Sequence, residues 1–167
     1  MSARLVARRA LSGDADGRAV LRLWLRLLST TSLIEQRVRS GLRERFNSTL
    51  PRFDLLAQLD HAPQGLTMGE LSRRMMVTSG NVTGLAARLI REGLVERRVD
   101  ASDRRSATLR LTTAGRRAFG QMAPIHAGWI VEVFKDLDAG ERDRLGMLLG
   151  RVKQSLGSTG ISQGRVE

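Results

Sequence analysis

The sequence predicts a mainly α-helical protein with one small β-hairpin, and three observations support this fold class. Apolar residues recur every three or four positions over most of the chain, which is the spacing of helices that bury one face. Paired helix-start residues occur twice, as Thr67 with Glu70 and as Asp138 with Glu141. Residues 94–112 instead alternate apolar and polar residues, as strands do. For 167 residues we expect one domain, with at most one added oligomerising element.

The composition is strongly basic and contains no cysteine. Lys plus Arg number 28 against 17 Asp plus Glu, which gives a net charge of +11, and all but two of the basic residues are arginines. Because the planar guanidinium fits phosphate and the edge of guanine, nucleic acid is the leading partner. A GC-rich codon bias explains the preference for Arg over Lys equally well, but it does not explain the net charge. The absence of Cys excludes disulfides and thiolate metal sites.

Several other classes of protein are disfavoured. No apolar run approaches the roughly 20 residues that span a bilayer, and the N-terminal stretch MSARLVARRALSGDADG lacks the apolar segment of a signal peptide. We therefore expect a cytoplasmic protein without a membrane partner. His61 and His126 lie in no nucleophilic arrangement, and no Gly-rich phosphate loop is present. The sequence therefore predicts no enzyme, no catalytic residues, no metal and no cofactor.

The first third of the chain predicts an arm and two helices. Residues 1–16 combine arginines with Gly and Asp and predict a mobile basic arm. A helix should follow up to about Arg45, with an apolar face too broad for an ordinary surface helix, formed by Val20, Leu21, Trp24, Leu25, Leu27, Leu28, Leu33, Ile34, Val38 and Leu42. A second helix should begin at Thr49, just before Pro51, and end before residues 63–65. Its expected inner face is Leu50, Phe53, Leu56, Ala57 and Leu59.

Residues 66–93 predict two short helices joined by a tight turn at residues 77–79. Thr67 and Glu70 form a capping box at the start of the first helix, and Gly93 closes the second. The expected inward residues are Met68, Leu71 and Met75 in the first helix and Val82, Leu85, Leu89 and Ile90 in the second. Such a pair is a helix-turn-helix, whose second helix enters the major groove of DNA.

The outward face of the second helix predicts the residues that bind DNA. Its polar side chains are Ser79, Asn81, Thr83 and Arg88, and Gly80 and Gly84 keep this face low for a close approach. Each glycine costs a helix roughly 1 kcal/mol, which argues for a local reason. The alternative is an ordinary, weak surface helix.

The hairpin predicts a second contact with DNA. Leu109 and Leu111 alternate with polar residues, so one side of the hairpin should be buried, which makes the unit a winged helix-turn-helix. Its tip carries Arg104 and Arg105, which can reach phosphates or the narrow minor groove. Asp103 would repel phosphate if it were unpaired, so we expect it to hold one guanidinium in position. A solvated tip that contributes little is the alternative.

The segment from Leu66 to Phe119 resembles the MarR family of bacterial transcription regulators. The resemblance rests on the stretches GELSRRM, SGNVTGLAARLIREGLVERR and SDRRSATLRLTTAGRRAF. Within them, the D-x-R wing motif falls on Asp103 and Arg105, and the L-T-x-x-G motif falls on Leu111, Thr112 and Gly115. The resemblance implies a homodimer with interlocking terminal helices, a pocket between the dimer region and the winged domain, and repression that a small ligand relieves.

The expected division of the chain follows from this resemblance. Residues 17–48 and 113–157 would hold the dimerisation helices, residues 49–112 the DNA-binding domain, and residues 158–167 a flexible tail. The last helix offers an apolar strip at Leu145, Leu148, Leu149, Val152 and Leu156. A partner chain explains apolar helices at both ends of the chain better than the alternative, which is a monomer core.

The ligand is predicted from a narrower resemblance. Residues 21–59 look like the MarR branch that controls the breakdown of hydroxycinnamates and related aromatic acids, some members of which respond to aromatic acyl-CoA thioesters. Trp24, Phe46 and His126 could border an apolar slot, and Arg37 and Arg39 could neutralise phosphates. Two positions apart on a helix, the two arginines point to different sides. Core packing for the aromatic residues and a solvated basic face for the arginines are equally good explanations.

Two functions remain open at this stage. The first is a repressor that leaves an inverted-repeat operator on double-stranded DNA when it binds an aromatic carboxylate or an aromatic acyl-CoA. The second is an architectural DNA-binding protein of low sequence specificity, which the high net charge favours. Asn81 and Arg88 favour the first function, because both side chains can make bidentate contacts with bases.

Overall fold

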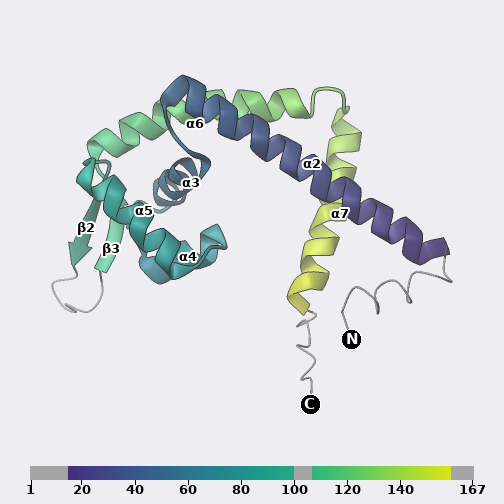
Figure 1. The fold of residues 1–167 in the computed structure, drawn as a ribbon, viewed down its shortest axis with the longest axis horizontal. Helices are drawn as coiled ribbons and strands as arrows, with labels where there is room; N and C mark the ends of the chain where they lie inside the picture. The colour runs from purple at the N-terminus through teal and green to yellow at the C-terminus, as the bar shows by residue number, and fades with distance from the viewer. Residues whose placement is uncertain (1–14, 100–106, 159–167) are drawn as a thin grey trace, which may run out of the picture. The chain divides into compact units, whose positions relative to one another are not determined.

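The computed structural model describes residues 15–99 and 107–158, and it confirms a mainly helical fold with a small antiparallel sheet (Figure 1). The first helix begins at Ala15, two residues before the expected boundary. The elements are α2 (Ala15–Phe46), α3 (Leu50–Asp60), β1 (Leu66–Thr67), α4 (Met68–Met75), α5 (Ser79–Arg91), β2 (Val95–Val99), β3 (Ala107–Leu111), α6 (Thr113–Val133) and α7 (Ala139–Ser158).

The sheet has three strands in the order β1-β3-β2, all antiparallel. The two strands of the expected hairpin pair with Val95 opposite Leu111 and Arg97 opposite Leu109, and both leucines are buried as expected. The third strand, β1, was not predicted. It has only two residues, Leu66 and Thr67, which are too few to show an alternating pattern.

The core of the helix-turn-helix region surrounds α3. Leu55, Leu56 and Leu59 of α3 are fully or almost fully buried, and Phe53 lies 5.4 Å from Phe119 of α6 between ring centroids. The expected inner face of α3 was wrong in detail, because Leu50 and Ala57 are only half-buried whereas Leu55 is completely buried. Neighbours on more than one side explain the difference, since α3 packs against α2, α4, α5 and β3.

The described residues divide into two compact units, one ending at His126 and the other beginning at Ala127. In the second unit, α7 starts with the expected capping box. The amide of Asp138 donates to Glu141 Oε2 at 2.9 Å, and the amide of Glu141 donates to Asp138 Oδ1 at 2.9 Å. The apolar strip of α7 is exposed in the single chain. Its residues are Leu145, Leu148, Leu149, Val152 and Leu156, with exposed fractions from 37% to 66%.

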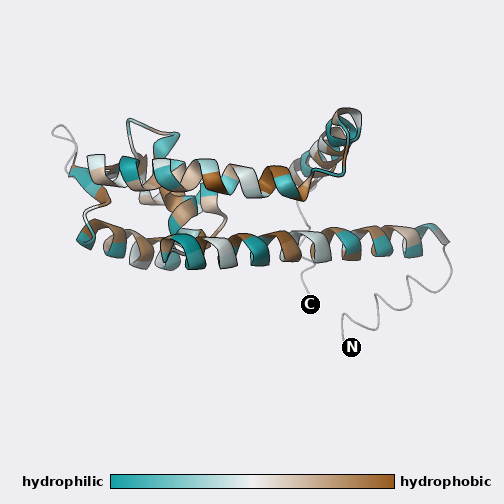
Figure 2. Cartoon of the chain, turned by 90° about the horizontal axis from the view of Figure 1, so that it is seen from above, coloured by the Kyte–Doolittle hydropathy of each residue, from teal (hydrophilic) through white to brown (hydrophobic). Residues whose placement is uncertain are grey.

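The two ends of the long helix α2 differ in how far their apolar side chains are buried. Near its C-terminal end, Val38 and Leu42 are buried. Nearer its start, large apolar side chains are exposed, and Figure 2 shows hydrophobic positions along the helix. The exposed residues are Val20, Leu21, Leu23, Trp24, Leu25, Leu28 and Leu33. Within one chain, therefore, only the later part of α2 buries its apolar face.

Candidate nucleic-acid interface

A tight turn joins α4 to α5, and backbone and side-chain hydrogen bonds hold it. Met76 ends α4 in the left-handed conformation, with φ of 54°. The hydroxyl of Ser72 donates to the carbonyl of Val77 at 2.6 Å, and Thr78 is the residue that precedes the first turn of α5. This turn spans residues 76–78, close to the predicted position, and fixes the direction in which α5 leaves α4.

The start of α4 is fixed by the predicted capping box. The amide of Glu70 donates to Thr67 Oγ1 at 3.2 Å, and Glu70 Oε2 accepts from the Thr67 amide at 2.8 Å. The bond from the Thr67 amide, and next that from the Thr67 hydroxyl, lower the pKa of Glu70. The carboxylate therefore stays charged where it satisfies the free amide at the start of the helix.

Two faces of α5 differ sharply in burial. Val82, Ala86 and Leu89 are buried, Leu85 is half-buried, and the predicted stripe was wrong at Ile90, whose side chain is 37% exposed. Ala86, which was not among the predicted inward residues, is buried. All four polar residues predicted to bind DNA are exposed on α5, namely Ser79, Asn81, Thr83 and Arg88.

These exposed residues are not equally available for hydrogen bonding. The hydroxyl of Thr83 donates to the carbonyl of Ser79 at 2.8 Å, so its proton is already used within α5. The side chains of Asn81 and Arg88 are exposed on α5. An amide and a guanidinium are the two side-chain groups that best match the edges of adenine and guanine.

An ion pair fixes the end of α5 to α3. Arg52 Nη1 donates to Glu92 Oε1 at 2.7 Å, and Nη2 donates to the other carboxylate oxygen. The hydrogen bond from Arg52 lowers the pKa of Glu92, and the nearby charges of Arg52, Arg91 and Arg88 act in the same direction. Sequence reasoning missed this pair because its members lie 40 residues apart. A carboxylate at the C-terminal end of a helix, where the helix dipole disfavours it, is the one signal that could have revealed it.

A second joint connects the end of α5 to the start of α6. The hydroxyl of Thr112 donates to the carbonyl of Gly93 at 2.6 Å and accepts from the amide of Gly115 at 3.0 Å. Gly93 has φ of 72°, and a Cβ on Gly115 would lie 1.9 Å from the carbonyl oxygen of Leu94. The L-T-x-x-G motif therefore closes the domain, because only Gly fits the close approach at residue 115.

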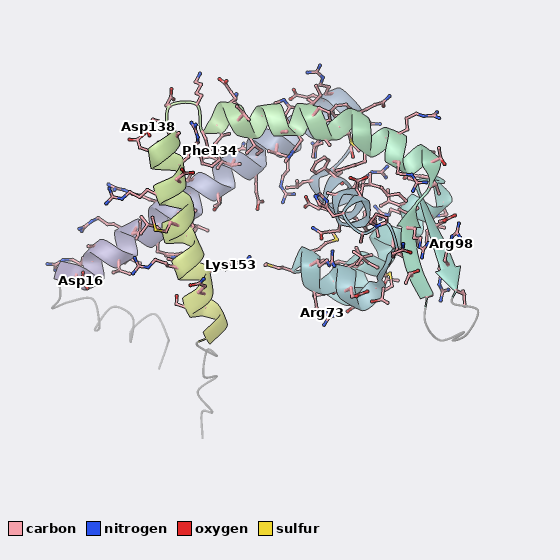
Figure 3. All side chains as sticks on the ribbon, turned by 180° about the vertical axis from the view of Figure 1, so that it is seen from behind. Asp16, Arg73, Arg98, Phe134, Asp138 and Lys153 are labelled. Atoms are coloured by element: carbon pink, nitrogen blue, oxygen red, sulfur yellow. The ribbon has the colours of Figure 1, made fainter. Side chains whose placement is uncertain are left out.

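Further exposed arginines lie on α4 and on the β2 strand of the hairpin. Arg98 on β2 is exposed and forms a 2.8 Å ion pair with Glu96, and Arg73 is exposed on α4. Figure 3 shows both arginines on the part of the molecule that carries α4, α5 and the hairpin. Neither was predicted, although the run Arg73-Arg74 beside the turn was a visible signal. The predicted tip residues Asp103, Arg104 and Arg105 lie outside the described residues.

The five predicted ligand residues are spread over the chain. Trp24 is 54% exposed and Phe46 is half-buried, and at 1.5 Å per residue they lie about 33 Å apart along α2. Arg37 and Arg39 are both exposed, and Arg39 Nη2 is 3.1 Å from Glu35 Oε2. The ring of His126 lies 4.4 Å from that of Phe53, and burial lowers its pKa. Trp24 and Phe46 are therefore not brought together within one chain.

In the ranges 15–99 and 107–158, no group of three or more His, Cys, Asp or Glu side chains is placed to hold a metal ion. No helix in that part of the chain is long and apolar enough to cross a membrane. The geometry of the first unit is that of a helix pair and a hairpin that present polar and basic side chains.

Comparison with known proteins agrees with this geometry. Residues 47–106 match the model of the MarR family. The HTH-type transcriptional regulator YkoM of Bacillus subtilis is 34% identical over 71% of this chain and 75% of its own length. A MarR family transcriptional regulator from Silicibacter pomeroyi is 32% identical, with a TM-score of 0.71 over 85% of this chain and 98% of that chain. The structure of MepR from S. aureus in complex with DNA is 25% identical, with a TM-score of 0.68 over 80% of this chain and 94% of that chain.

Fold and relatives together define a winged helix-turn-helix, DNA-binding transcription regulator rather than an enzyme. The chain belongs to the MarR family.

Proposed function

We propose that the chain acts as a homodimer, represses transcription from an inverted-repeat operator, and leaves the operator when it binds an aromatic carboxylate or an aromatic acyl-CoA thioester. The exposed polar face of α5 carries this proposal, because its opposite face is buried and the helix is fixed at its C-terminal end. A rigid helix with a free polar face is what the reading of base edges in a major groove requires. The resemblance to the DNA-bound MepR structure supports the same use of the fold.

In this proposal the helix and the wing have separate roles. Asn81 and Arg88 contact base edges, while Ser79 and Thr83 support the helix against the DNA strand. Arg104 and Arg105 contact phosphate or the minor groove, and Asp103 orients one of them. Replacement of Asn81 should change which bases matter, whereas replacement of Arg105 should weaken binding to most sequences and lower the salt slope by about one unit.

The proposal of a dimer rests on the apolar surface that one chain leaves uncovered. Residues 17–48 include the exposed apolar face at the start of α2, and residues 113–157 include the exposed strip of α7. Large exposed apolar patches are typical of surfaces that another chain covers. Two copies related by a twofold axis would then present two recognition helices to one inverted repeat.

The proposed effector site must use more than one chain if all its predicted residues take part. Because Trp24 and Phe46 lie about 33 Å apart on one straight helix, a single aromatic ring cannot touch both within one protomer. A dimer permits Trp24 of one protomer to face Phe46 and His126 of its partner. Arg37 and Arg39 would then bind a carboxylate or the phosphates of CoA, with Glu35 competing for Arg39.

Footprinting on DNA recovered from a random library tests the mode of DNA binding. We expect two protected half-sites whose centres are roughly 34 Å apart, one helical turn, and a dimer in solution at the same protein concentration. If bulk competitor DNA displaced the protein equally well from every sequence, the protein would be architectural instead. The net charge of +11 also favours that alternative. A single protected half-site would contradict the dimer.

Calorimetry with aromatic acids and their CoA thioesters, with and without operator DNA, tests the response to a ligand. Coupling of about 1 to 3 kcal/mol should lower operator affinity roughly 5- to 150-fold, because the ligand must favour the state that does not fit the operator. If the thioester is the effector, Arg37→Ala and Arg39→Ala should weaken its binding far more than binding of the free acid. Ligand binding that leaves the affinity for DNA unchanged would exclude this mechanism.

A further inference from the structure

A hollow of about 420 Å³ lies beside one flank of the recognition helix α5, inside the first compact unit. Three parts of the chain surround it, namely the start of α3, the end of α4 with the following turn, and the outward flank of α5. The lining residues that matter here are Met75, Val77, Asn81, Gly84, Leu85 and Arg88. The hollow therefore shares Asn81 and Arg88 with the proposed base-reading surface.

The chemistry of the hollow combines an apolar floor with a polar rim. Met75, Val77 and Leu85 supply apolar surface, whereas Asn81 and Arg88 supply donors. Gly84 lines the hollow, and a Cβ added there would enter open space, since it would meet no protein atom within 4 Å. The fold thus gives no internal packing reason for Gly at this position, although Gly is less favourable than Ala inside a helix.

We infer that this hollow receives the edge of a base pair and holds the 5-methyl group of a thymine against its apolar floor. The inference deepens the proposed function and rests on α5 reading DNA. In the major groove the thymine methyl is the one apolar group that a base edge presents, and it packs against apolar side chains. The amide of Asn81 on the rim can form two hydrogen bonds with an adenine next to that thymine. The positive charge of Arg88 attracts the DNA that carries both bases.

Replacement of thymine by uracil in the operator tests the contact from the DNA side. Uracil lacks only the methyl group, so pairing and the other groove atoms are unchanged. We expect one thymine in each half-site at which this change lowers the affinity of the full-length protein about fourfold, equivalent to about 0.8 kcal/mol for one buried methyl group. Uracil at the other positions should leave the affinity unchanged.

A variant that fills the hollow tests the contact from the protein side. Gly84→Leu should bind the unmodified operator less tightly and should lose the fourfold preference for thymine over uracil, because the methyl site is then occupied. The matched control is Gly120→Leu on α6, since Gly120 is also exposed and also has no atom within 4 Å of an added Cβ. The control should keep the thymine preference, and thermal unfolding of both variants should show that each is folded.

Each outcome decides a different point. A preferred operator without any thymine position that depends on its methyl group would overturn the inference and leave the proposed function standing. A thymine preference of the same size in Gly84→Leu would place the methyl group elsewhere and would also overturn it. Loss of aromatic acid binding in Gly84→Leu, with the thymine preference retained, would assign the hollow to the effector instead. Absence of any preferred sequence would overturn the proposed function and this inference together.

Discussion

The winged region and the helix α7 use the same kind of apolar residue at the same helical spacing, but only the winged region buries it within one chain. Leu55, Leu71 and Leu89 of the winged region are completely buried, whereas Leu148 and Leu149 of α7 are 47% and 41% exposed. An apolar stripe thus predicts that a face will be covered without saying which chain covers it. The burial of neighbouring residues in the structure supplies the second piece of information.

Helix α2 contains both kinds of surface. Leu33 is 66% exposed and Val38 is 3% exposed, so the change falls within less than two turns of one continuous helix. The later turns of α2 belong to the core around α3, and the earlier turns carry apolar surface that needs another partner. Variants on either side of this boundary should therefore affect different properties of the protein.

The largest expected effect comes from Gly115→Ala, which disrupts the close contact between the start of α6 and Leu94 in the winged region. The added Cβ would lie 1.9 Å from the carbonyl oxygen of Leu94, so the first turn of α6 or the start of β2 must move. We expect a loss of about 3 kcal/mol in the free energy of unfolding, measured by urea denaturation.

The matched control for this change is Gly120→Ala on the same helix, where an added Cβ meets no atom within 4 Å. Removal of an exposed helical glycine should raise the free energy of unfolding by up to about 1 kcal/mol. Equal effects of the two substitutions would show that the close approach at Gly115 is unimportant.

An effect of about the same size is expected from Leu149→Gln in α7, which should leave the winged region folded and weaken the proposed dimer. Because each dimer would lose two apolar contacts of about 1.5 kcal/mol each, the dimer dissociation constant should rise roughly 100-fold. Analytical ultracentrifugation across protein concentrations measures this change.

Met147→Gln is the control, since Met147 is 62% exposed and its helical spacing places it away from the strip that contains Leu149. It should change the dissociation constant by less than about threefold. Loss of the thermal unfolding transition in Leu149→Gln would mean that this strip belongs to the core of a single chain.

A smaller effect should follow from Glu92→Gln, which weakens the joint between α3 and α5. Since Arg52 lowers the pKa of Glu92, the contribution of the ion pair is fully present above the ordinary carboxyl pKa of about 4.3 and disappears as the pH falls through the lower folded-state value. At neutral pH we expect a loss of about 1 kcal/mol, because the carboxylate is partly exposed to solvent.

Denaturation curves at pH 7 and below pH 4 separate this joint from an ordinary surface pair. The comparison variant is Glu96→Gln, which removes the more exposed ion pair to Arg98 and should cost almost nothing at either pH. If Glu92→Gln were as mild as Glu96→Gln at pH 7, the joint would not stabilise the position of α5.

The smallest expected effect concerns His126, at the end of the first compact unit. Burial lowers the pKa of its imidazole, so folding favours the neutral ring that packs on Phe53. Its contribution to stability is complete above the ordinary His pKa of about 6.5 and is lost as the pH falls through the lower folded-state value. His126→Phe should make the unfolding temperature less dependent on pH below 6.5. His61 is present in both proteins, so an unchanged pH dependence would show that residue 126 is not responsible.

Local patterns predicted most of the elements correctly. The capping boxes at Thr67 and Asp138 act within four residues, so the sequence alone was sufficient to place the starts of α4 and α7. The helical periodicity of α5 predicted its buried face except at two positions, since Ala86 is buried and Ile90 is exposed. Periodicity identifies the direction of a face, but the depth of each position depends on how closely the neighbouring elements approach.

Features that depend on distant residues were not predictable. The pair of Arg52 and Glu92 and the pairing of Leu66 with Leu109 join segments about 40 residues apart, and no local pattern records them. The proposed site shows the same division. Asn81 and Arg88 could be proposed from the sequence because they lie outside a recognisable apolar stripe, whereas the hollow beside them needs the start of α3 and so appears only in the folded chain.

The joint at Thr112 has a mechanical consequence. One hydroxyl is bonded both to the last turn before β2 and to the first turn of α6, at 2.6 Å and 3.0 Å. Hydrogen bonds of this length tolerate little stretching, so a rotation of the first turn of α6 must carry the end of α5 with it or break the joint. The hydroxyl of Thr112 therefore couples the segment that follows α5 to the first turn of α6, and a displacement of one is passed to the other as long as both hydrogen bonds hold.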